Sequence, residues 1–362
     1  MPAARPSGRG CRARVANRRT CSSVHRDNIR NGVRGHLAGR RVDRDTWIVR
    51  KMHGPRLRRL ALLAGVVGCG VLGCTTPEPE ISPQRASPQP RSGIPAGLIA
   101  FVSDREGVEA LYLMQANGTE VRRLTQELPP VSHPAWSTDG RWLAFNAGTP
   151  MRSDIYLISP DGSGLTQVTR DASANFYPSW SPDGRRLAFS SNRDGDWDIF
   201  VMNVDGSNVR QLVNSPGLDD KPQWSPDGSR IGFATTRRGA PELRAVDPDT
   251  GVEGPLLPRT VHGINPAWTP DGSRLAYNVV TSVGFDIAVM AADGSEARSV
   301  VAESPSEERP RWSPDGRSLA YYSDAEGSWD VYVVHVQTGV RHALTDAPGF
   351  DGQPAWQPVT AQ

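Results

Sequence analysis

Six short polar stretches stand at equal spacing along the chain, and their side chains could bind a partner. They mix acids, bases, amides and aromatic rings, whereas the residues that follow them are nearly constant. A solvated set of loops without any ligand is the alternative interpretation, and both stay open at this point. The stretches are Val131–His133, Asn175–Tyr177, Asp219–Lys221, Gly263–Asn265, Glu307–Arg309 and Asp351–Gln353.

Nine residues of these stretches are candidate binding residues, because their side chains suit the recognition of a protein or peptide. A tyrosine offers a large contact area, an arginine can donate two parallel hydrogen bonds, and the carboxylates can accept from basic groups. The candidates are His133, Tyr177, Asp219, Asp220, Lys221, Asn265, Glu307, Arg309 and Gln353.

The second possible class of function is a hydrolase or lyase that acts on an envelope glycan or small ester with a metal ion. No His-x-x-x-His spacing and no Gly-x-Ser-x-Gly elbow supports it, and the chain ends at residue 362, so we expect no hydrolase domain. Asp194-Gly-Asp196-Trp-Asp198 alternates carboxylates, but its glycine is misplaced for a calcium loop. We expect no catalytic residue, metal or cofactor. The available ligands would be Asp219, Glu307, His133 and His262.

A repeat of 44 residues sets the spacing of the polar stretches. A tryptophan recurs at this interval, with a proline two places before it and, in each full copy, an aromatic residue nine places after it. Six units therefore fill residues 97–360, and such a period indicates a solenoid, a propeller or an array. The tryptophans are Trp136, Trp180, Trp224, Trp268, Trp312 and Trp356.

Each unit divides into four short strands. In one unit the strands are expected at 178–180, 186–190, 198–203 and 209–213, and Ser-Pro-Asp-Gly at 181–184 forms the first turn. Four antiparallel strands per 44 residues are typical of a propeller blade. We therefore expect an all-β, six-bladed β-propeller, in which the aspartates of these turns serve the turn itself and the tryptophans lie in the core.

The two ends of the repeat region predict how the ring closes. The chain enters at Gly97–Phe101, which matches the second strand of a unit, and leaves at Pro354–Trp356, which matches the first. The C-terminal strand should therefore complete the N-terminal blade and leave no unpaired inner edge. The polar stretches would then be loops before the inner strands, all at one mouth of the central channel.

Five motifs of the unit resemble the TolB-type β-propeller repeat. They are Trp-Ser-Pro-Asp-Gly at 180–184, Leu-Ala-Phe at 187–189, Asp-Ile-Tyr at 154–156, Asp-Gly at 161–162 and Leu-Thr at 124–125. The resemblance covers about residues 97–358 and implies a non-enzymatic propeller with a partner among envelope lipoproteins. TolB proteins also have an N-terminal α/β domain and are soluble in the periplasm, whereas here a proline-rich segment precedes the repeats.

The segments before the repeats predict export and a lipid anchor. Residues 1–51 are strongly basic and are interpreted as an extension upstream of a misassigned start, with a nucleic-acid-binding arm as the alternative. Residues 52–73 combine Arg56, Arg58 and Arg59 with a 13-residue apolar run, as in a signal peptide. Val71-Leu-Gly-Cys74 resembles a lipoprotein box, so Cys74 is the expected lipidation site. Residues 74–96 are rich in proline and are expected to form an extended tether.

Charge narrows the range of partners. The chain has a net charge of +2, but residues 1–51 contribute +11 and residues 52–73 contribute +3, which leaves −12 for the rest. An acidic domain fits a phosphate backbone poorly, so we expect no nucleic acid. The sequence thus predicts a lipid-anchored monomer at the periplasm or cell surface, and in the outer membrane if the cell is Gram-negative. It would contact the membrane through its lipid only and bind an envelope protein or peptide at the channel mouth.

Overall fold

The computed structural model describes residues 94–258, 261–302, 304 and 306–359. Cys74, the basic extension, the signal peptide and nearly all of the tether therefore lie outside the described residues. Every described residue belongs to one compact unit, which lies within residues 56–362. In this part of the chain, no helix is long and apolar enough to cross a membrane.

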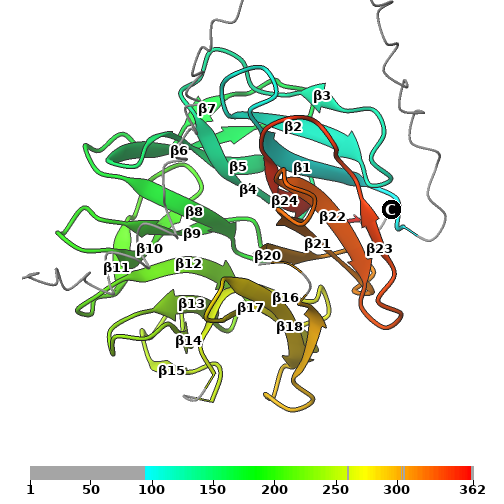
Figure 1. Cartoon of the computed structure of the whole chain (residues 1–362). Coiled ribbons are helices and arrows are strands. Elements are labelled where there is room, and N and C mark those ends of the chain that lie inside the picture. Colours follow the sequence, from blue (N-terminus) through cyan, green and yellow to red (C-terminus); the bar gives the residue numbers. More distant parts are fainter. Residues whose placement is uncertain (1–93, 259–260, 303, 305, 360–362) are drawn as a thin grey trace, which may run out of the picture. The chain divides into compact units, whose positions relative to one another are not determined.

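Six antiparallel sheets of four strands each form the blades of a ring (Figure 1), as the 44-residue period predicts. Blade 1 consists of β24 (Asp351–Trp356), β1 (Leu98–Ser103), β2 (Ala110–Gln115) and β3 (Arg122–Arg123). Blade 2 consists of β4 (Val131–Trp136), β5 (Leu143–Thr149), β6 (Arg152–Ile158) and β7 (Thr166–Gln167). Blade 3 consists of β8 (Asn175–Trp180), β9 (Arg186–Ser191), β10 (Asp198–Asn203) and β11 (Arg210–Val213).

The remaining three blades follow in chain order, each from its inner strand outward. Blade 4 consists of β12 (Asp219–Trp224), β13 (Ile231–Thr235), β14 (Glu242–Val246) and β15 (Glu253–Pro255). Blade 5 consists of β16 (Gly263–Trp268), β17 (Arg274–Val280), β18 (Phe285–Ala291) and β19 (Arg298–Val301). Blade 6 consists of β20 (Glu307–Trp312), β21 (Ser318–Ser323), β22 (Asp330–His335) and β23 (Arg341–Ala343).

The C-terminal strand closes the ring, which confirms the prediction from the two ends of the repeat. β24 pairs antiparallel with β1, with Trp356 opposite Ile99 and Ala355 opposite Ala100, and the two strands lie side by side in Figure 1. The indole Nε1 of Trp136 donates a hydrogen bond to the carbonyl oxygen of Ala355 at 3.1 Å. The closing strand is thus joined to blade 1 by its β-ladder and to blade 2 by a tryptophan.

The Ser-Pro-Asp-Gly segment forms the expected turn between the first two strands of a blade. In blade 3, the hydroxyl of Ser181 donates to Asp183 Oδ1 at 2.6 Å, and the backbone N–H of Arg185 donates to the same oxygen at 3.1 Å. Gly184 has a φ of 69°, which a side chain disfavours. The hydrogen bond from Ser181 is the main reason that the pKa of Asp183 is lowered.

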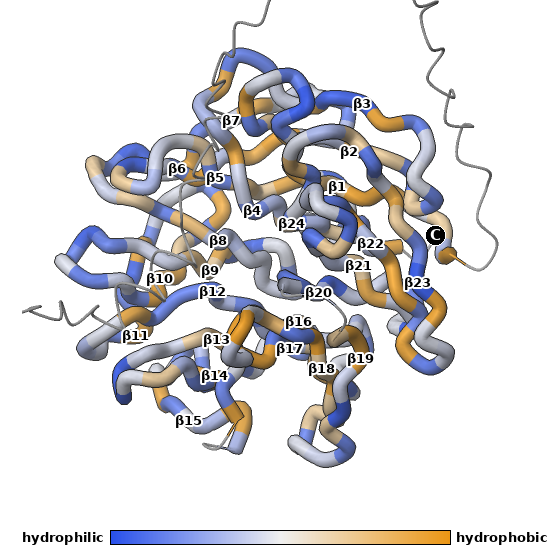
Figure 2. Tube along the Cα trace, in the orientation of Figure 1, coloured by the Kyte–Doolittle hydropathy of each residue, from blue (hydrophilic) through white to orange (hydrophobic). Residues whose placement is uncertain are grey.

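The six tryptophans that recur every 44 residues lie in the core, as predicted, and some of them join neighbouring blades. Their exposed fractions are between 3% and 8%. Trp180 Nε1 donates to the carbonyl oxygen of Ala135 at 3.1 Å, and Trp312 Nε1 donates to that of Ala267 at 3.0 Å, in each case one blade back. Hydrophobic residues follow the strands between the blades, while hydrophilic residues dominate the outer loops and the inner strands β12 and β20 (Figure 2).

Candidate binding site in the central channel

The polar stretches form the first halves of the inner strands, so the expectation that they are loops before those strands is wrong. In β12, Asp219 and Asp220 pair with Thr235 and Ala234 of β13. The ladder then resumes at Gln223, and the other five blades show the same arrangement. The sequence did not predict that the strand continues through these residues, because the proline two places before each tryptophan argues against an inner strand.

The third residue of each stretch occupies a β-bulge. Lys221 and Pro222 lie where the register between β12 and β13 shifts, so two residues of the inner strand face one residue of its neighbour. None of the six bulge residues is glycine, although their φ angles lie between 54° and 59°, in the left-handed region that side chains rarely adopt. These channel residues, as we call them, are His133, Tyr177, Lys221, Asn265, Arg309 and Gln353.

Hydrogen bonds from the neighbouring blade hold several of these bulges in place. The backbone N–H of Lys221 donates to Ser190 Oγ at 3.2 Å, and that of Arg309 donates to Asn278 Oδ1 at 2.9 Å. The N–H of His133 donates to the side-chain oxygen of Gln353 at 2.6 Å. The backbone N–H groups of these distorted segments are thus hydrogen-bonded to neighbouring blades. The propeller scaffold therefore sets the direction in which these channel side chains point.

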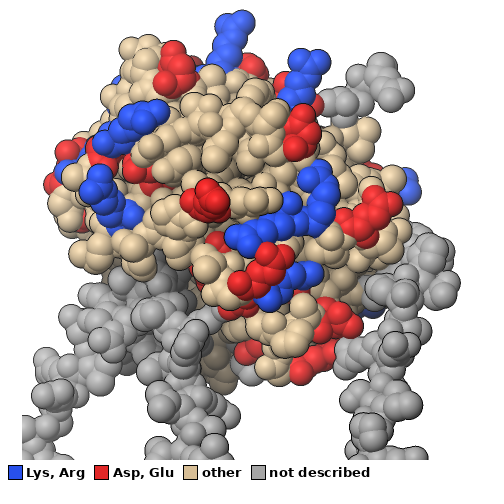
Figure 3. Space-filling model, turned by 90° about the horizontal axis from the view of Figure 1, so that it is seen from above, with Lys and Arg blue, Asp and Glu red and all other residues tan. Residues whose placement is uncertain are grey.

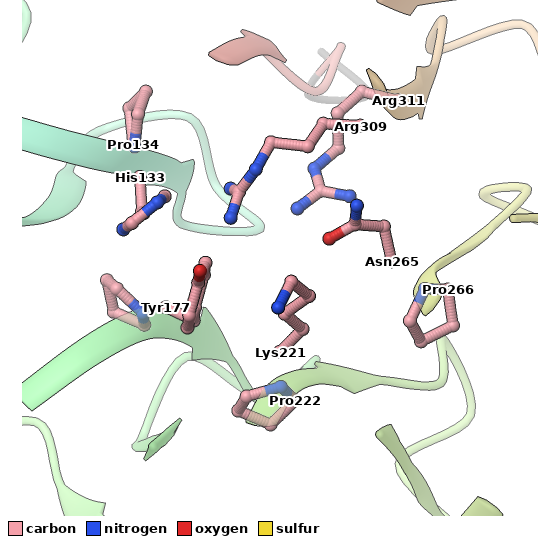
Figure 4. Close-up of a pocket in the computed structure, with 10 residues that line it drawn as sticks. His133, Pro134, Tyr177, Lys221, Pro222, Asn265, Pro266, Arg309 and Arg311 are labelled. Carbon is pink, nitrogen blue, oxygen red and sulfur yellow. The ribbon is translucent and has the colours of Figure 1, made fainter. Parts of the chain in front are cut away.

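Five of the six channel residues, all except Gln353, line one small cavity (Figure 4). The rings of His133 and Tyr177 lie 4.0 Å apart between centroids. The guanidinium carbon of Arg309 lies 4.6 Å, and Lys221 Nζ 4.8 Å, from the centroid of the Tyr177 ring. The volume of this cavity is about 20 Å³, which is room for about one water molecule. The side chains thus leave little free space at this point of the channel.

Arg311 also lines this cavity, and our sequence interpretation missed it. It stands two places after Arg309 on β20, so the two-residue period of a strand could have placed both guanidinium groups on one face. Burial, together with the positive charge of Arg309, lowers the pKa of Arg311 to about 9. Arg311 therefore remains charged at neutral pH.

Three of the predicted binding residues point elsewhere. The carboxylate of Asp219 is completely buried, accepts a hydrogen bond from Ser215 Oγ at 2.5 Å and lies 3.2 Å from Arg237 Nη2. Burial raises its pKa. Glu307 accepts from the backbone N–H of Ser304 at 2.6 Å. Asp220 is buried in an ion pair with Lys221. Asp219 and Glu307 thus support the blades, and Asp220 neutralises one channel cation.

The possible metal ligands are not brought together. Among the described residues, no group of three or more His, Cys, Asp or Glu side chains could hold a metal ion. His133 Nδ1 lies 2.8 Å from Asn146 Oδ1, whereas His262 is exposed, with its Nδ1 3.2 Å from the carbonyl oxygen of Pro241. In the acidic loop, Asp194 and Asp196 are exposed while Asp198 is buried. The acidic loop and the four candidate ligands therefore do not fit a metal centre.

Comparisons with solved structures agree with this architecture. TolB from Acinetobacter baumannii has a TM-score of 0.67 at 23% identity, with 74% of this chain and 69% of that chain covered. The putative TolB from Agrobacterium tumefaciens has a TM-score of 0.51 at 21% identity, with 61% and 88% covered. Hydrazine synthase from Kuenenia stuttgartiensis has a TM-score of 0.61 at 15% identity, with 73% and 47% covered. At these identities the likeness shows the fold alone.

Sequence comparison identifies the family. A curated relative from Bacillus subtilis (strain 168), described as the uncharacterized peptidase YuxL, is 45% identical over 58 residues. The match spans 16% of this chain and only 9% of the relative, so its description applies to that protein. The family described as the TolB beta propeller domain matches residues 99–360, most of the chain and all six blades. This protein therefore belongs to the TolB β-propeller domain family.

Proposed function

We propose that this protein is a non-catalytic, lipid-anchored module of the cell envelope that binds a protein or peptide at the mouth of its channel. The observation that carries this proposal is that six chemically different residues occupy six equivalent bulges, and five of them line one cavity. A rigid scaffold that presents varied chemistry in one place is typical of a recognition surface. Membership of the TolB family supports the same interpretation.

The strained bulges favour binding because they orient the channel side chains in advance. A non-glycine residue in the left-handed region costs about 1–3 kcal/mol, and six such residues surround one axis. A partner that meets side chains already held in place loses less conformational entropy on binding. Outside the channel, acidic and basic side chains are interspersed over the face seen in Figure 3, with no large patch of one sign. The channel is thus the more distinctive surface.

Two changes in the channel test this function. Tyr177→Ala combined with Arg309→Ala removes the aromatic face and the cation above it, and should weaken partner binding by more than about 2 kcal/mol. Because Tyr177 is only 5% exposed, the variant should also melt below the parent, and binding is measured at a temperature at which it is folded. Trp142→Ala is the matched control, because this tryptophan is 36% exposed and lies beside a Ser-Thr-Asp-Gly turn. Full retention of the partner by the folded double variant would contradict the proposal.

The lipid anchor rests on the order of basic residues, apolar run and Gly-Cys from Arg56 to Cys74. Multiple acyl chains at Cys74 would hold the protein stably at the membrane, and the tether would keep the propeller away from its surface. Mass spectrometry of the mature N-terminus should find an acylated cysteine. A Cys74→Ser variant that still fractionates with membranes would show that something else retains the protein there.

A metal-dependent hydrolase or lyase is the second candidate function, and the peptidase-named relative is the observation that favours it. Its ligands would be sought among His133, His262, Asp219 and Glu307, which the fold separates. Metal analysis of the purified protein discriminates between the two candidates. A bound metal ion, together with a glycan- or ester-cleaving activity that chelation abolishes, would favour catalysis.

A further inference from the structure

The channel contains more positive than negative charge. Lys221 is neutralised by Asp220, and both side chains are buried. No carboxylate oxygen of the described residues lies within 4.0 Å of the guanidinium of Arg309 or Arg311. The hydrogen bond described for the Arg311 guanidinium runs to the carbonyl oxygen of Pro310 at 3.1 Å. Arg309 is thus buried and Arg311 half-buried, and the two cations stand together without a described carboxylate within ion-pair distance.

Such an arrangement is costly in a folded chain. Arg309 is only 6% exposed, and a buried charge without a counter-ion loses its hydration without compensation. The aromatic face of Tyr177 offsets a part of this cost for Arg309. Arg311 has a second positive charge as its neighbour, which adds repulsion in a confined space. An anion bound between Arg309 and Arg311 would therefore reduce this cost.

The other blades show that the fold itself does not need these cations. At the position of Arg309 they carry His, Tyr, Lys, Asn and Gln, and only the lysine is an unconditional cation, already paired with Asp220. At the position of Arg311 the other five blades carry Ala, Ser, Gln, Ala and Ala. Two unpaired cations thus occur together in blade 6, at positions where smaller or neutral side chains build the same strand.

The space around the pair limits the size of the anion. The cavity between the channel residues is about 20 Å³, so only about one oxygen-sized atom of an anion fits there. Arg311 also borders a wider cavity of about 320 Å³ that is lined by the six tryptophans at the far ends of the inner strands. In Figure 4 the guanidinium groups of Arg309 and Arg311 point into the centre, together with the amide of Asn265.

We propose that the channel binds a carboxylate between Arg309 and Arg311. A planar carboxylate matches the fork of donors on a guanidinium group, and one of its oxygens suits the small cavity. The carboxylate can come from a free small acid or from a peptide, as an acidic side chain or a C-terminus. Only the peptide source rests on the proposed function, since a free acid would occupy the site without any partner.

Melting curves of the full mature chain with added anions test this site. Acetate should raise the melting temperature of the parent by about 2 °C or more over chloride at equal ionic strength. Arg311→Gln copies the residue that blade 4 carries at this position. This variant should melt above the parent in chloride, because it removes an uncompensated charge, and should lose the response to acetate. Arg309→Gln, which copies Gln353, should lose that response as well.

Arg317→Gln is the matched control, because Arg317 is an exposed arginine of the same blade. It removes the same charge and should respond to acetate as the parent does. No response of the parent to acetate, or an equal response of all four proteins, would overturn the site. A response to inorganic phosphate without one to acetate would overturn the assignment to a carboxylate.

Two peptides distinguish the sources of the carboxylate. A tetra-alanine peptide with a free C-terminus and its C-terminal amide differ in one charge, and only the first should bind by calorimetry if the partner supplies the group. Its affinity should fall at least tenfold in Arg311→Gln. Binding of acetate without binding of either peptide would support the site with a free acid as its ligand. In that case the proposed partner binding would have to be sought elsewhere.

Discussion

Each inner strand joins two halves that obey different constraints. The half that ends in Trp-Ser-Pro-Asp-Gly is almost the same in every full unit, because its side chains have structural roles. Trp312 is buried and donates a hydrogen bond to Ala267 of the preceding blade, and Asp315 fixes the turn. In the first half of each inner strand, the backbone rather than the side chain makes the structural hydrogen bond. The N–H of Arg309 is bound to Asn278, so its side chain can vary.

This difference explains why one propeller ring can present six different groups. A residue whose side chain fills the core cannot change without a cavity or a clash. A bulge residue is held by its backbone and by the proline that follows, so the scaffold tolerates His133 in one blade and Arg309 in another. The following predictions test this division, from the largest expected effect to the smallest.

Removal of residues 350–362 should destabilise the whole propeller. This change deletes β24, so β1 loses its inner partner and Trp136 loses the carbonyl oxygen of Ala355. An open inner edge and a missing blade interface should lower the melting temperature of all six blades together. Calorimetry provides the measurement, and a cooperative transition within a degree or two of the parent would show that closure does not matter.

Trp224→Ala should cost roughly 3–5 kcal/mol, as expected when a large core side chain is truncated. Its ring is 3% exposed and packs in the cluster that includes Ile231 and Phe233. The guanidinium carbon of Arg186 lies 4.9 Å from its centroid. Chemical denaturation measures the loss, with Trp142→Ala as the exposed control. Equal stability of the two variants would place Trp224 outside the core.

The half of each inner strand that ends in Trp-Ser-Pro-Asp-Gly was predictable from the sequence, because the same residue types recur wherever the same structure recurs. The 44-residue spacing of Trp180 and Trp224 predicts the blades, and the match of Phe101 to later units predicts the closure by Trp356. These inferences rest on packing and turn geometry, which act locally and recur in every blade.

The variable half could be predicted in part only. The convergence of Tyr177 and Arg309 follows from the ring, but the bulge does not, because no glycine marks the positive φ. The inward direction of Lys221 and the structural role of Asp219 depend on this unmarked change of register. Arg311 was missed for a simpler reason. The other blades carry Ala, Ser or Gln at the equivalent position, so the repeat does not mark it as a binding position.

Ser190→Ala tests whether the backbone holds the bulge. The hydroxyl oxygen of Ser190 accepts from the buried N–H of Lys221 at 3.2 Å, and its loss should cost about 1–3 kcal/mol. Blade 4 carries Ala234 at the equivalent position, so Ala234→Ser is the reverse change and should be neutral or stabilising. Denaturation of both variants measures the effect. Unchanged stability of Ser190→Ala would mean that the bulge does not depend on this hydrogen bond.

The smallest effect should come from two aspartates with opposite environments. Asp271 stands in the constant turn, where the hydroxyl of Thr269 is the main reason that its pKa is lowered to about 2. Asp198 opens β10, where burial and the negative charge of Asp196 raise its pKa to about 6, although Gln211 Nε2 donates to it at 2.8 Å. Both carboxyl groups have an ordinary pKa near 3.9 in the unfolded chain.

These shifts act on stability with opposite signs. Between pH 4 and pH 6 the folded chain holds a proton on Asp198 that the unfolded chain has lost, so the stability due to this group falls as the pH rises through that range. Asp271 contributes stability above about pH 4, and this contribution is lost as the pH falls toward 2. Asp198→Asn should therefore flatten the stability profile between pH 4 and pH 6, whereas Asp271→Asn should flatten it below pH 4. Denaturation across both ranges measures the slopes, and equal profiles of the two variants would refute the assignment of these aspartates to different environments.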